Sequence, residues 1–398
     1  MNPLKNKRVL LGVTGSIACY KALDLASKLT QSGALVNTIM TKSSMEFINP
    51  ISFKSISNRT VITDLFDNKS NISINHIAMA EWAEVIIIAP ATANTISKLA
   101  NGASDDALGT TLLATKAPII IAPAMDGNMW ENPATQYNIV KLMERGILIE
   151  GPQFGRMASG QVGSGRMTEP SELTQVISMV LGKNGDLQGK KIVVTAGGTH
   201  EPIDPVRSIT NKSSGKMGFA IAEAARDRGA SVTLISAPSH LQDPIGITQK
   251  KISSAMDMKN ILLPETSNAD ALIMAAAVGD WRSKTISTSK EKKHNDNIWT
   301  IDLVRNSDLI SEITNPNIIK IGFAAETENL VKNSKKKIID KKLDLIIGND
   351  VSRKDIGFNS EQNEVVIINQ SGEIENLPLM SKYDLSHEIL DRVQSLLR

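Results

Sequence analysis

The sequence is poor in cysteine, in long apolar runs and in excess charge of either sign. Cys19 is the only cysteine among 398 residues, which excludes an internal disulfide and a cysteine-built zinc or iron–sulfur site. No apolar run approaches the roughly 20 residues that span a bilayer. Lys and Arg number 44 against 42 Asp and Glu, and the net charge of +2 excludes an overall polybasic nucleic-acid binder. We therefore expect a globular, cytoplasmic protein with neither membrane nor nucleic acid as partner.

Short apolar runs alternate with amphipathic stretches, a pattern typical of a parallel sheet covered by helices. At about 150 residues per domain, the length predicts two to three domains. A basic lead-in, an apolar run and a glycine turn occur twice, at residues 6–15 and again at 189–198. We predict two doubly wound α/β domains, residues 1–182 and 189–398, joined by a short linker.

Each predicted domain has its own set of expected elements. In the first, the strands are 9–13, 35–40, 85–89, 119–122 and 147–149, and the helices are 17–32, 105–114, 134–145 and 171–181. In the second, after the strand within 189–198, the strands are 231–235, 272–274, 318–323, 343–347 and 365–368, and the helices are 217–228, 329–342 and 381–397. Residues 101–106 predict a helix cap, and the lysine-rich segment 282–297 predicts a mobile basic loop or a solvated hairpin.

Three expected strands of the first domain end in small or hydroxylated residues, at 12–16, 89–94 and 122–125. Glycines let a backbone approach a phosphate, and the start of a helix offers N–H groups and positive potential. The first loop alone fits a phosphate site or a tight turn equally well, because it lacks the full G-x-G-x-x-G pattern. Ligands of open α/β sheets bind beyond such strand ends, so the three loops together predict a crevice for a planar ligand.

His76 precedes the run Ala78–Ala83 and has two interpretations. A lone histidine is in most cases a surface or core residue. Histidine is also the side chain whose protonation changes near neutrality, which suits a general base. The residues themselves leave this choice open.

The order and spacing of motifs in the first half resemble the flavin-dependent cysteine decarboxylases. The motifs are His76, Ala89-Pro90-Ala91-Thr92-Ala93-Asn94, Pro123-Ala124-Met125-Asp126-Gly127-Asn128-Met129-Trp130 and Gly163-Ser164-Gly165-Arg166-Met167. The match is to the decarboxylase half of the bifunctional coenzyme A biosynthesis proteins, and it implies a flavodoxin-like fold.

The resemblance implies that the first domain binds FMN and decarboxylates phosphopantothenoylcysteine. In the family, FMN oxidises the substrate thiol, carbon dioxide leaves, and the reduced flavin then reduces the enethiol. His76 would be the catalytic base, and Arg166 would belong to a substrate-recognition flap. The stretches expected around FMN contain Gly15, Ser16, Thr92, Asn94 and Met125.

Two candidate catalytic positions depart from the family pattern. Asp126 stands where the family has asparagine, and Ser159 stands where it has a proton-donating cysteine. An aspartate lacks the amide N–H that asparagine offers to a substrate carboxylate, and in its ionised form it repels that carboxylate. A serine hydroxyl is a far weaker acid than a thiol, which titrates at about pH 8.5. These departures open an alternative in which the flavin domain is silent or releases the unreduced enethiol.

Residues 204–218 suit an anion-binding site at the start of a helix. They combine hydroxyls, lysine and glycine, although Ser213 as an ordinary N-cap explains part of the pattern. The segment is not a Walker A loop, because no glycine stands four residues before Gly215-Lys216.

Charged residues further along the chain are suited to bind a nucleoside triphosphate. Asp280 follows an expected strand, where it can hold Mg²⁺ on phosphates or cap a turn. Lys290, Lys337 and Lys341 are candidates to neutralise the triphosphate. Lys337 and Lys341 lie one helical turn apart and fit a solvated helix face equally well.

These stretches closely resemble the phosphopantothenate–cysteine ligase half of the same bifunctional proteins. Asp204–Gly218 is nearly a full match, and Gly322–Thr327 and Leu343–Asp350 follow in family order, so the resemblance covers essentially the whole chain. It implies a Rossmann-like fold in which the phosphopantothenate carboxylate attacks the α-phosphate of CTP. The amine of cysteine then attacks the acyl-cytidylate and releases CMP, helped by positioning and charge neutralisation.

The resemblance also implies roles for single residues. Asn211 would contact the acyl intermediate, Lys290 would stabilise the reacting phosphate, and Asp280 would organise CTP with Mg²⁺. Arg207 would reach the substrate phosphate across a dimer interface. The CTP pocket would further contain Ala275, Ala276, Asn306, Ser307, Asp308, Leu309, Phe323, Lys337 and Lys341.

The resulting hypothesis is a bifunctional enzyme that converts phosphopantothenate, cysteine and CTP into phosphopantetheine with FMN and Mg²⁺. The resemblance implies a homo-oligomer, with trimers of the first domain and dimers of the second, up to a dodecamer. The alternative is an active ligase with a flavin domain impaired by Asp126 and Ser159.

Overall fold

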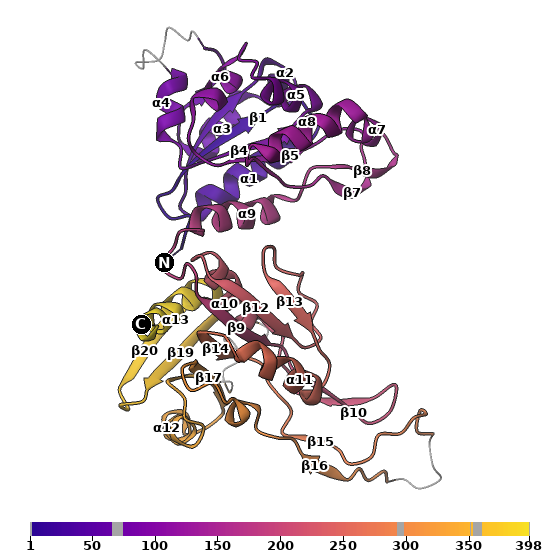
Figure 1. Ribbon diagram of the computed structural model, residues 1–398, viewed down its shortest axis with the longest axis vertical. Helices are drawn as coiled ribbons and strands as arrows, with labels where there is room; N and C mark the ends of the chain where they lie inside the picture. Colours follow the sequence, from indigo (N-terminus) through magenta and orange to yellow (C-terminus); the bar gives the residue numbers. More distant parts are fainter. Residues whose placement is uncertain (1, 66–74, 293–297, 351, 353–359, 398) are drawn as a thin grey trace. The chain divides into compact units, whose positions relative to one another are not determined.

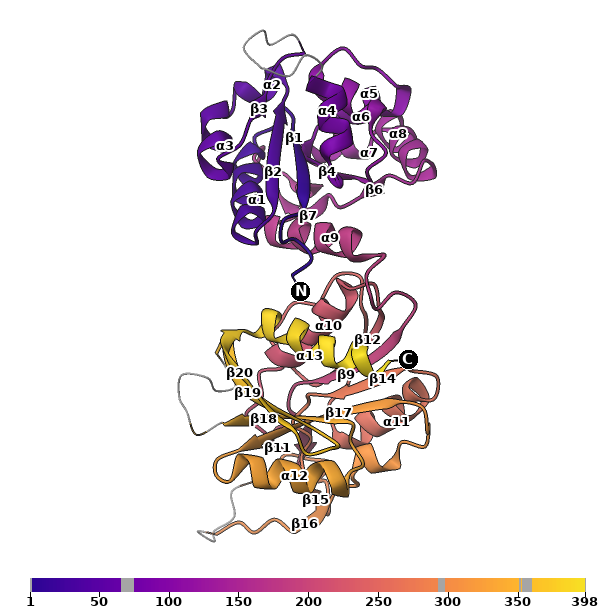
Figure 2. The same cartoon turned by 90° about the vertical axis from the view of Figure 1, so that its left-hand side faces the viewer.

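The computed structural model describes residues 2–65, 75–292, 298–350, 352 and 360–397. The chain divides into two compact units, Asn2–Leu181 and Gly182–Arg398, and each unit has its own sheet (Figures 1 and 2). Among the described helices, none combines the length and the apolar character that crossing a membrane requires.

The first unit is built on a six-stranded parallel sheet in the order β3-β2-β1-β4-β5-β6. Its strands are β1 (Arg8–Val13), β2 (Leu35–Met40), β3 (Val61–Ile62), β4 (Val85–Ala91), β5 (Ile119–Pro123) and β6 (Leu148–Ile149). Without the two-residue edge strand β3, the strands follow the flavodoxin-like order 2-1-3-4-5. Every residue of β4 is buried, as expected at the centre of a parallel sheet covered on both faces.

Helices cover both faces of this sheet. They are α1 (Cys19–Gln31), α2 (Lys42–Met45), α3 (Pro50–Ser57), α4 (Asn75–Trp82), α5 (Ala93–Asn101), α6 (Ala107–Ala114), α7 (Gly127–Glu131), α8 (Pro133–Glu144) and α9 (Pro170–Gly182). On one face, Met79, Ile96, Leu108 and Leu142 of α4, α5, α6 and α8 pack in one core with Ile86 of β4. Helices α1 and α3 contact each other on the opposite face (Figure 2). An antiparallel hairpin of β7 (Gln153–Arg156) and β8 (Val162–Arg166) lies beside α7.

The second unit is built on an eight-stranded sheet in the order β13-β12-β9-β14-β17-β18-β19-β20. Its strands are β9 (Lys191–Ala196), β12 (Ser231–Ser236), β13 (Thr248–Lys251), β14 (Ala271–Met274), β17 (Ile319–Glu326), β18 (Leu345–Asp350), β19 (Gln362–Asn369) and β20 (Ile374–Ser381). The first six are parallel, whereas β19 pairs antiparallel with β18, and β20 pairs antiparallel with β19. Counted along the chain, the parallel part has the Rossmann order 3-2-1-4-5-6.

Two helical layers enclose this sheet. They contain α10 (Lys216–Arg226), α11 (Ala255–Thr266), α12 (Leu330–Asp340), α13 (Lys382–Leu396) and the 3-10 helix η1 (Leu309–Glu312). Ile221 of α10 and Ile389 of α13 belong to the core on one face, and Met258 of α11 and Ile338 of α12 belong to the core on the other. Two small antiparallel ribbons pair β10 (His200–Pro202) with β11 (Ser208–Thr210) and β15 (Trp281–Ser283) with β16 (Leu303–Arg305).

The doubly wound fold that the sequence predicts is confirmed in both units, and every expected strand and helix is present. The prediction missed several elements, among them α3, α4, α5, α11, the β7–β8 hairpin and β20. Helix α5 begins two residues after β4 ends, so its apolar residues merge with those of the strand. Helix α11 contains Pro264, which signals a break, and β20 buries only Leu377 fully. The expected loop 282–297 begins with β15 and has no helix or strand over 284–292, while 293–297 lies outside the described residues.

A buried histidine joins α13 to the core of the second unit. His387 is 2% exposed, and its ring meets that of Tyr383 edge-on at 4.7 Å. Neither ring nitrogen has a hydrogen-bond partner within the described part of the chain. Burial, together with the nearby Arg228 guanidinium, lowers the pKa of His387 to about 3. The folded protein therefore holds this imidazole neutral.

This burial predicts that the second unit loses stability on mild acidification. An unfolded histidine takes up a proton below about pH 6.5, whereas folded His387 stays neutral down to about 3. The unfolded state thus binds more protons in this window, and stability falls as pH falls, by about 1 kcal/mol between pH 6 and pH 5. Hydrogen exchange of α13 amides, corrected for intrinsic exchange, measures this loss. His387→Phe should reduce this loss of stability, and the substitution of an exposed histidine, His240→Gln, should not. An unchanged pH dependence of stability in His387→Phe would contradict the role of His387.

Candidate functional site

The carboxyl ends of the neighbouring strands β1, β4 and β5 form the candidate site of the first unit. Thr14, which is 1% exposed, joins two of them: its hydroxyl donates to the Pro90 carbonyl at 2.8 Å and accepts the Thr92 N–H at 3.1 Å. The Ala124 N–H donates to the Ala91 carbonyl at 3.0 Å and so joins β4 to β5. The three predicted loops therefore share one edge of the sheet.

The predicted phosphate loop lies between β1 and α1. A Cβ on Gly15 would lie 2.5 Å from the Cβ of Ser43, so the close approach to α2 requires glycine. The Ser16 hydroxyl accepts the Ala18 N–H at 3.3 Å. The Thr41 hydroxyl, at the start of α2, is buried and has no hydrogen-bond partner among the described residues. An unpaired buried hydroxyl at this edge fits a site that a polar group, such as a flavin phosphate, completes.

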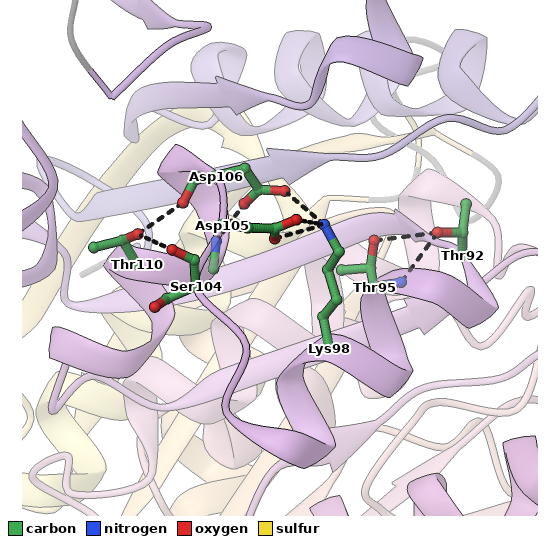
Figure 3. A network of polar contacts seen from close by, with 8 residues as sticks. Thr92, Thr95, Lys98, Ser104, Asp105, Asp106 and Thr110 are labelled. Atoms are coloured by element: carbon green, nitrogen blue, oxygen red, sulfur yellow. Dashed lines mark hydrogen bonds and ion pairs between the residues drawn. The ribbon is translucent and has the colours of Figure 1, made fainter.

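Thr92 and Asn94 lie at the start of α5. Thr92 is its N-cap and accepts the Thr95 N–H at 3.3 Å, with the two hydroxyl oxygens 3.1 Å apart (Figure 3). The helix start therefore points at the same edge as the β1 and β5 loops.

An ion-pair network fixes the far end of α5 to the start of α6. Lys98 binds Asp105 at 2.6 Å and lies 3.6 Å from Asp106 (Figure 3). Asp106 also caps α6 by accepting the Gly109 N–H at 2.7 Å, which confirms the predicted helix cap. The network joins the later part of α5 to the start of α6.

The segment after β5 is joined to the β7–β8 hairpin. The Met125 N–H donates to the Gly165 carbonyl at 3.1 Å. Asp126 is the N-cap of α7, and its Oδ1 accepts the Asn128 N–H at 3.0 Å. The Ser159 hydroxyl lies 3.4 Å from Oδ2 of Asp126. The structure thus brings the two departures from the family pattern into contact.

Arg166 lies on the same hairpin, at the end of β8, whereas His76 lies elsewhere in the first unit. Arg166 pairs with Glu169 at 3.0 Å, and Glu169 also binds the buried Lys21 at 2.7 Å. His76 is half-buried in the first turn of α4, which lies on the opposite side of the unit from α7 (Figure 1). Within one chain, His76 is therefore not brought together with Asp126 and Ser159.

The second unit has a cavity of about 400 Å³ at the carboxyl ends of β14, β17 and β18. Its walls include the start of α10, the segment after β14, residues 305–310 and the side chains of Lys337 and Lys341. The predicted CTP residues that line it are Ala275, Ala276, Asp280, Asn306, Ser307, Asp308, Leu309, Phe323, Lys337 and Lys341. Lys290 is the one predicted CTP residue that does not.

Carboxylates accompany both lysines of the cavity. Lys337 binds Glu326 at 2.6 Å, and Lys341 binds Asp308 at 3.2 Å. Burial raises the pKa of Glu326, but hydrogen bonds from Lys337 and Asn333 outweigh it and leave the pKa below its ordinary value. Both lysines thus line the cavity and do not form a purely solvated face.

Asp280 is exposed at the mouth of the cavity, and its backbone is tied to the next wall. The Asn306 N–H donates to the Asp280 carbonyl at 2.8 Å, and the Asn306 amide donates to the Gly279 carbonyl at 2.8 Å. No cluster of three His, Cys, Asp or Glu side chains suited to a metal occurs within the described ranges. A cation at Asp280 therefore needs oxygens from a bound ligand as well.

Comparisons with known proteins agree with this division of the chain. Residues 1–182 match the family described as Flavoprotein, and residues 187–397 match the DNA/pantothenate metabolism flavoprotein C-terminal domain. The chain is 43% identical to the coenzyme A biosynthesis bifunctional protein CoaBC of Vibrio vulnificus, with all of both chains covered. It is 44% identical to that of Bacillus subtilis, covering 99% of this chain and 98% of the relative. The solved C-terminal domain of a CoaBC is 38% identical, covers 54% of this chain and 98% of its own, and has a TM-score of 0.46.

The chain belongs to the CoaBC family of bifunctional coenzyme A biosynthesis proteins. It is an enzyme with a flavoprotein decarboxylase half and a ligase half, as the sequence resemblance implies.

Three predicted residues of the ligase half lie outside the cavity lining. The Asn211 amide donates to the carbonyls of Ala277 and Val278, both at 3.3 Å, and so lies over the end of β14. Lys290 is exposed on the loop 284–292. The guanidinium carbon of Arg207 lies 5.1 Å from the centre of the Trp299 ring.

Asp204 connects two of these residues, and sequence reasoning assigned it no role. Its buried carboxylate accepts the N–H groups of Val206 and Arg207 at 2.8 Å and that of Glu291 at 3.2 Å, and it pairs with Arg207 at 3.0 Å. Burial raises the pKa of Asp204, but these backbone donors and the Arg207 charge outweigh it and hold the pKa low. Asp204 thereby ties the Arg207 turn to the residue next to Lys290.

Asn349, Asn363 and Lys382 also line the cavity and were missed. The Asn349 side-chain oxygen is buried without a hydrogen-bond partner among the described residues. Asn349 belongs to the motif Leu343–Asp350, and the match of that motif to the family could have identified Asn349 as a site residue. Lys382 is the first residue of α13, and Asn363 is the second residue of β19. The sequence pattern gives no sign that either element lies near β14.

Removal of the Thr14 hydroxyl should loosen the flavin edge. Thr14→Val keeps the side-chain shape but leaves the Pro90 carbonyl and the Thr92 N–H without this partner, at a cost of about 1–3 kcal/mol. We expect a lower unfolding temperature of the first unit and less flavin retained per chain, measured by thermal scans and absorbance. Thr14→Ser keeps the hydroxyl and should retain the flavin; equal flavin content in both variants would contradict this role.

Proposed function

We propose that the ligase half joins cysteine to phosphopantothenate through an acyl-cytidylate made from CTP, and that the flavin half decarboxylates the product to phosphopantetheine. The observation that carries the proposal is the cavity at the carboxyl edge of the second sheet, which gathers the predicted nucleotide residues from four separate segments.

The first reaction must turn a carboxylate into an acylating agent. A carboxylate is a poor electrophile, and its attack on the α-phosphate of CTP supplies CMP as the later leaving group. The start of α10 offers N–H groups and positive potential to phosphates, and Lys337 and Lys341 add positive charge in the cavity. Asp280 would hold Mg²⁺ together with phosphate oxygens.

The remaining ligase residues would act on the acyl part of the substrate. Asn211, beside the end of β14, would contact the acyl-cytidylate near the cavity wall. Lys290 would approach the reacting phosphate, and the Asp204 tie to Glu291 supports a defined position for its loop. Arg207 would contact the substrate phosphate of a neighbouring subunit.

Omission of single components tests the ligase chemistry. We expect phosphopantothenoylcysteine by mass spectrometry only when phosphopantothenate, cysteine, CTP and Mg²⁺ are all present, and acyl-cytidylate when cysteine alone is omitted. Asp280→Asn should raise the KM for Mg²⁺-CTP at least about tenfold, because one charge–metal contact is lost. Asp302→Asn removes an exposed carboxylate outside the cavity and serves as control. Product formation without nucleotide would overturn the assignment.

The flavin half fits FMN at the edge formed by β1, β4 and β5. Gly15 and Ser16 would lie at its phosphate, and Thr92, Asn94 and Met125 at the loops beside it, with the buried Thr41 hydroxyl as a further polar contact. When bound, FMN supplies the oxidation of the substrate thiol and the later reduction. His76 would take a proton from the substrate, and Arg166 would belong to the flap over it.

The position of His76 favours a site shared between two copies of the chain. Helix α4 and the α7–hairpin region lie on opposite sides of the first unit, so one chain does not supply both. A homo-oligomer, such as a trimer of this unit, would complete the site with His76 from one chain and Asp126 from the next.

Subunit mixing tests this arrangement. His76→Ala and Asp126→Ala should each lose most decarboxylation, while mixed oligomers of the two variants should regain a measurable fraction, because some sites receive both intact residues. A different affinity tag on each variant verifies that the two kinds of chain have mixed. The control is a mixture of two differently tagged His76→Ala chains, which should stay inactive. Verified mixed oligomers without recovered activity would exclude the shared site.

A further inference from the structure

Two buried polar residues, Lys382 and Asn363, line the cavity of the second unit and have no role in the ligase chemistry proposed above. Lys382 is 6% exposed and Asn363 is 3% exposed, and both belong to the cavity wall. We propose, on the basis of the proposed CTP chemistry, that Lys382 and Asn363 bind the β- and γ-phosphates of CTP, the part that leaves as pyrophosphate.

Contacts with the segment before β19 and within β19 hold the two side chains in place. The Lys382 N–H donates to the Glu361 carbonyl at 3.0 Å, and the Lys382 ammonium donates to the Ser360 carbonyl. The Asn363 side-chain oxygen accepts the Glu364 N–H at 3.0 Å, which fixes the amide and leaves its NH₂ group as the donor toward a ligand. Both residues are therefore positioned donors in the wall of the cavity.

Positive charge is concentrated at this end of the cavity. Lys216, the first residue of α10, also lines the cavity and pairs with Glu361, whose side chain is largely exposed. Burial and the nearby Lys216 charge lower the pKa of the Lys382 ammonium, although the Glu361 charge opposes them. A buried ammonium close to a second one costs folding free energy, and a bound polyanion offsets that cost.

The cavity has cationic walls on both faces of the sheet. Helices α10 and α13 pack on one face, and α12 packs on the other, with Lys337 within it and Lys341 at its end (Figure 2). The cavity crosses the strand ends between these helices, so a triphosphate bound there can contact cations of both walls. On the Lys382 side, the start of α10 adds backbone N–H groups and positive potential.

The β- and γ-phosphates suit this end because of where the acyl group would lie. Asn211, the proposed contact of the acyl-cytidylate, belongs to the segment just before α10 and lies over the end of β14. The α-phosphate must stand beside the acyl group, so the rest of the triphosphate can run along the start of α10 toward Lys216 and Lys382.

The reaction itself places negative charge at this end. As the substrate carboxylate attacks, an oxygen–phosphorus bond forms at the α-phosphate, and the bond from the α-phosphorus to the bridging oxygen breaks. The electron pair of that bond leaves with the pyrophosphate. Donors that are already fixed in a buried wall stabilise this charge as it develops. Lys382 and Asn363 supply such donors.

Binding measurements with the full-length chain test the assignment without turnover. In calorimetric titrations with Mg²⁺ and CTP but no other substrate, Lys382→Met should raise the dissociation constant at least about tenfold, because a charge-assisted contact with phosphate is lost. Asn363→Ala should raise it by a smaller factor, because its contact is neutral. The dissociation constant of CMP, which lacks the β- and γ-phosphates, should change by less than about twofold in both variants.

Controls separate lost binding from lost folding. Lys335→Met changes an exposed lysine of α12 that lies outside the cavity wall, and it should bind CTP as the wild type does. The rise in unfolding temperature on addition of Mg²⁺ and CTP is compared with each variant's own baseline without nucleotide. A less stable variant that binds normally therefore keeps the full rise.

The outcomes distinguish this assignment from the wider function. A wild-type protein that binds no CTP would reject the proposed ligase chemistry, and this assignment with it. Normal CTP affinity in Lys382→Met and Asn363→Ala, or an equal loss of affinity for CMP and CTP, would overturn the assignment and leave the ligase chemistry intact.

Discussion

Burial of both faces of a parallel sheet is the constraint on which the rest of this structure depends. In β4 every residue is buried, and the strands beside it are apolar for the same reason. Polar chemistry can then enter only where strands end and their backbone leaves the core. Because parallel strands end on one edge, the loops after β1, β4 and β5 must meet, and so must those after β14, β17 and β18. The two candidate sites are consequences of this arrangement in two copies of the same kind of sheet.

The strand-end loops were predictable for this reason, and so was the doubly wound class. The run Val85–Ala91 is too apolar for an exposed strand, and the small residues after it mark the place where the core ends. Periodicity failed where local patterns were weak or interrupted, as in α11 with Pro264 and in the exposed β20. The resemblance to a known family supplied most single residues, and ten of the predicted nucleotide residues line one cavity.

Contacts between distant segments could not be predicted from sequence patterns. Asp204 accepts N–H groups from both its own turn and Glu291, and no spacing rule joins residues 87 positions apart. The same holds for Lys382 and Asn349, which reach the cavity from α13 and β18. For His76, the sequence pattern suggested a proximity that one chain does not show. The family pattern groups His76 with Asp126, but α4 and α7 lie on opposite sides of the first unit. Such a pattern records the residues of a site without recording how many chains build it.

The same distinction changes the meaning of Asp126 and Ser159. Taken one at a time, each substitution weakens the flavin half: the aspartate repels a carboxylate substrate, and the serine is too weak an acid. Taken together, they place a carboxyl and a hydroxyl in contact, held by a capped helix and a packed hairpin. Both oxygens of Asp126 accept hydrogen bonds there, one from the Asn128 N–H and the other from the Ser159 hydroxyl. The two departures are thus one joined feature of the fold, and a change at either residue also removes a contact of the other.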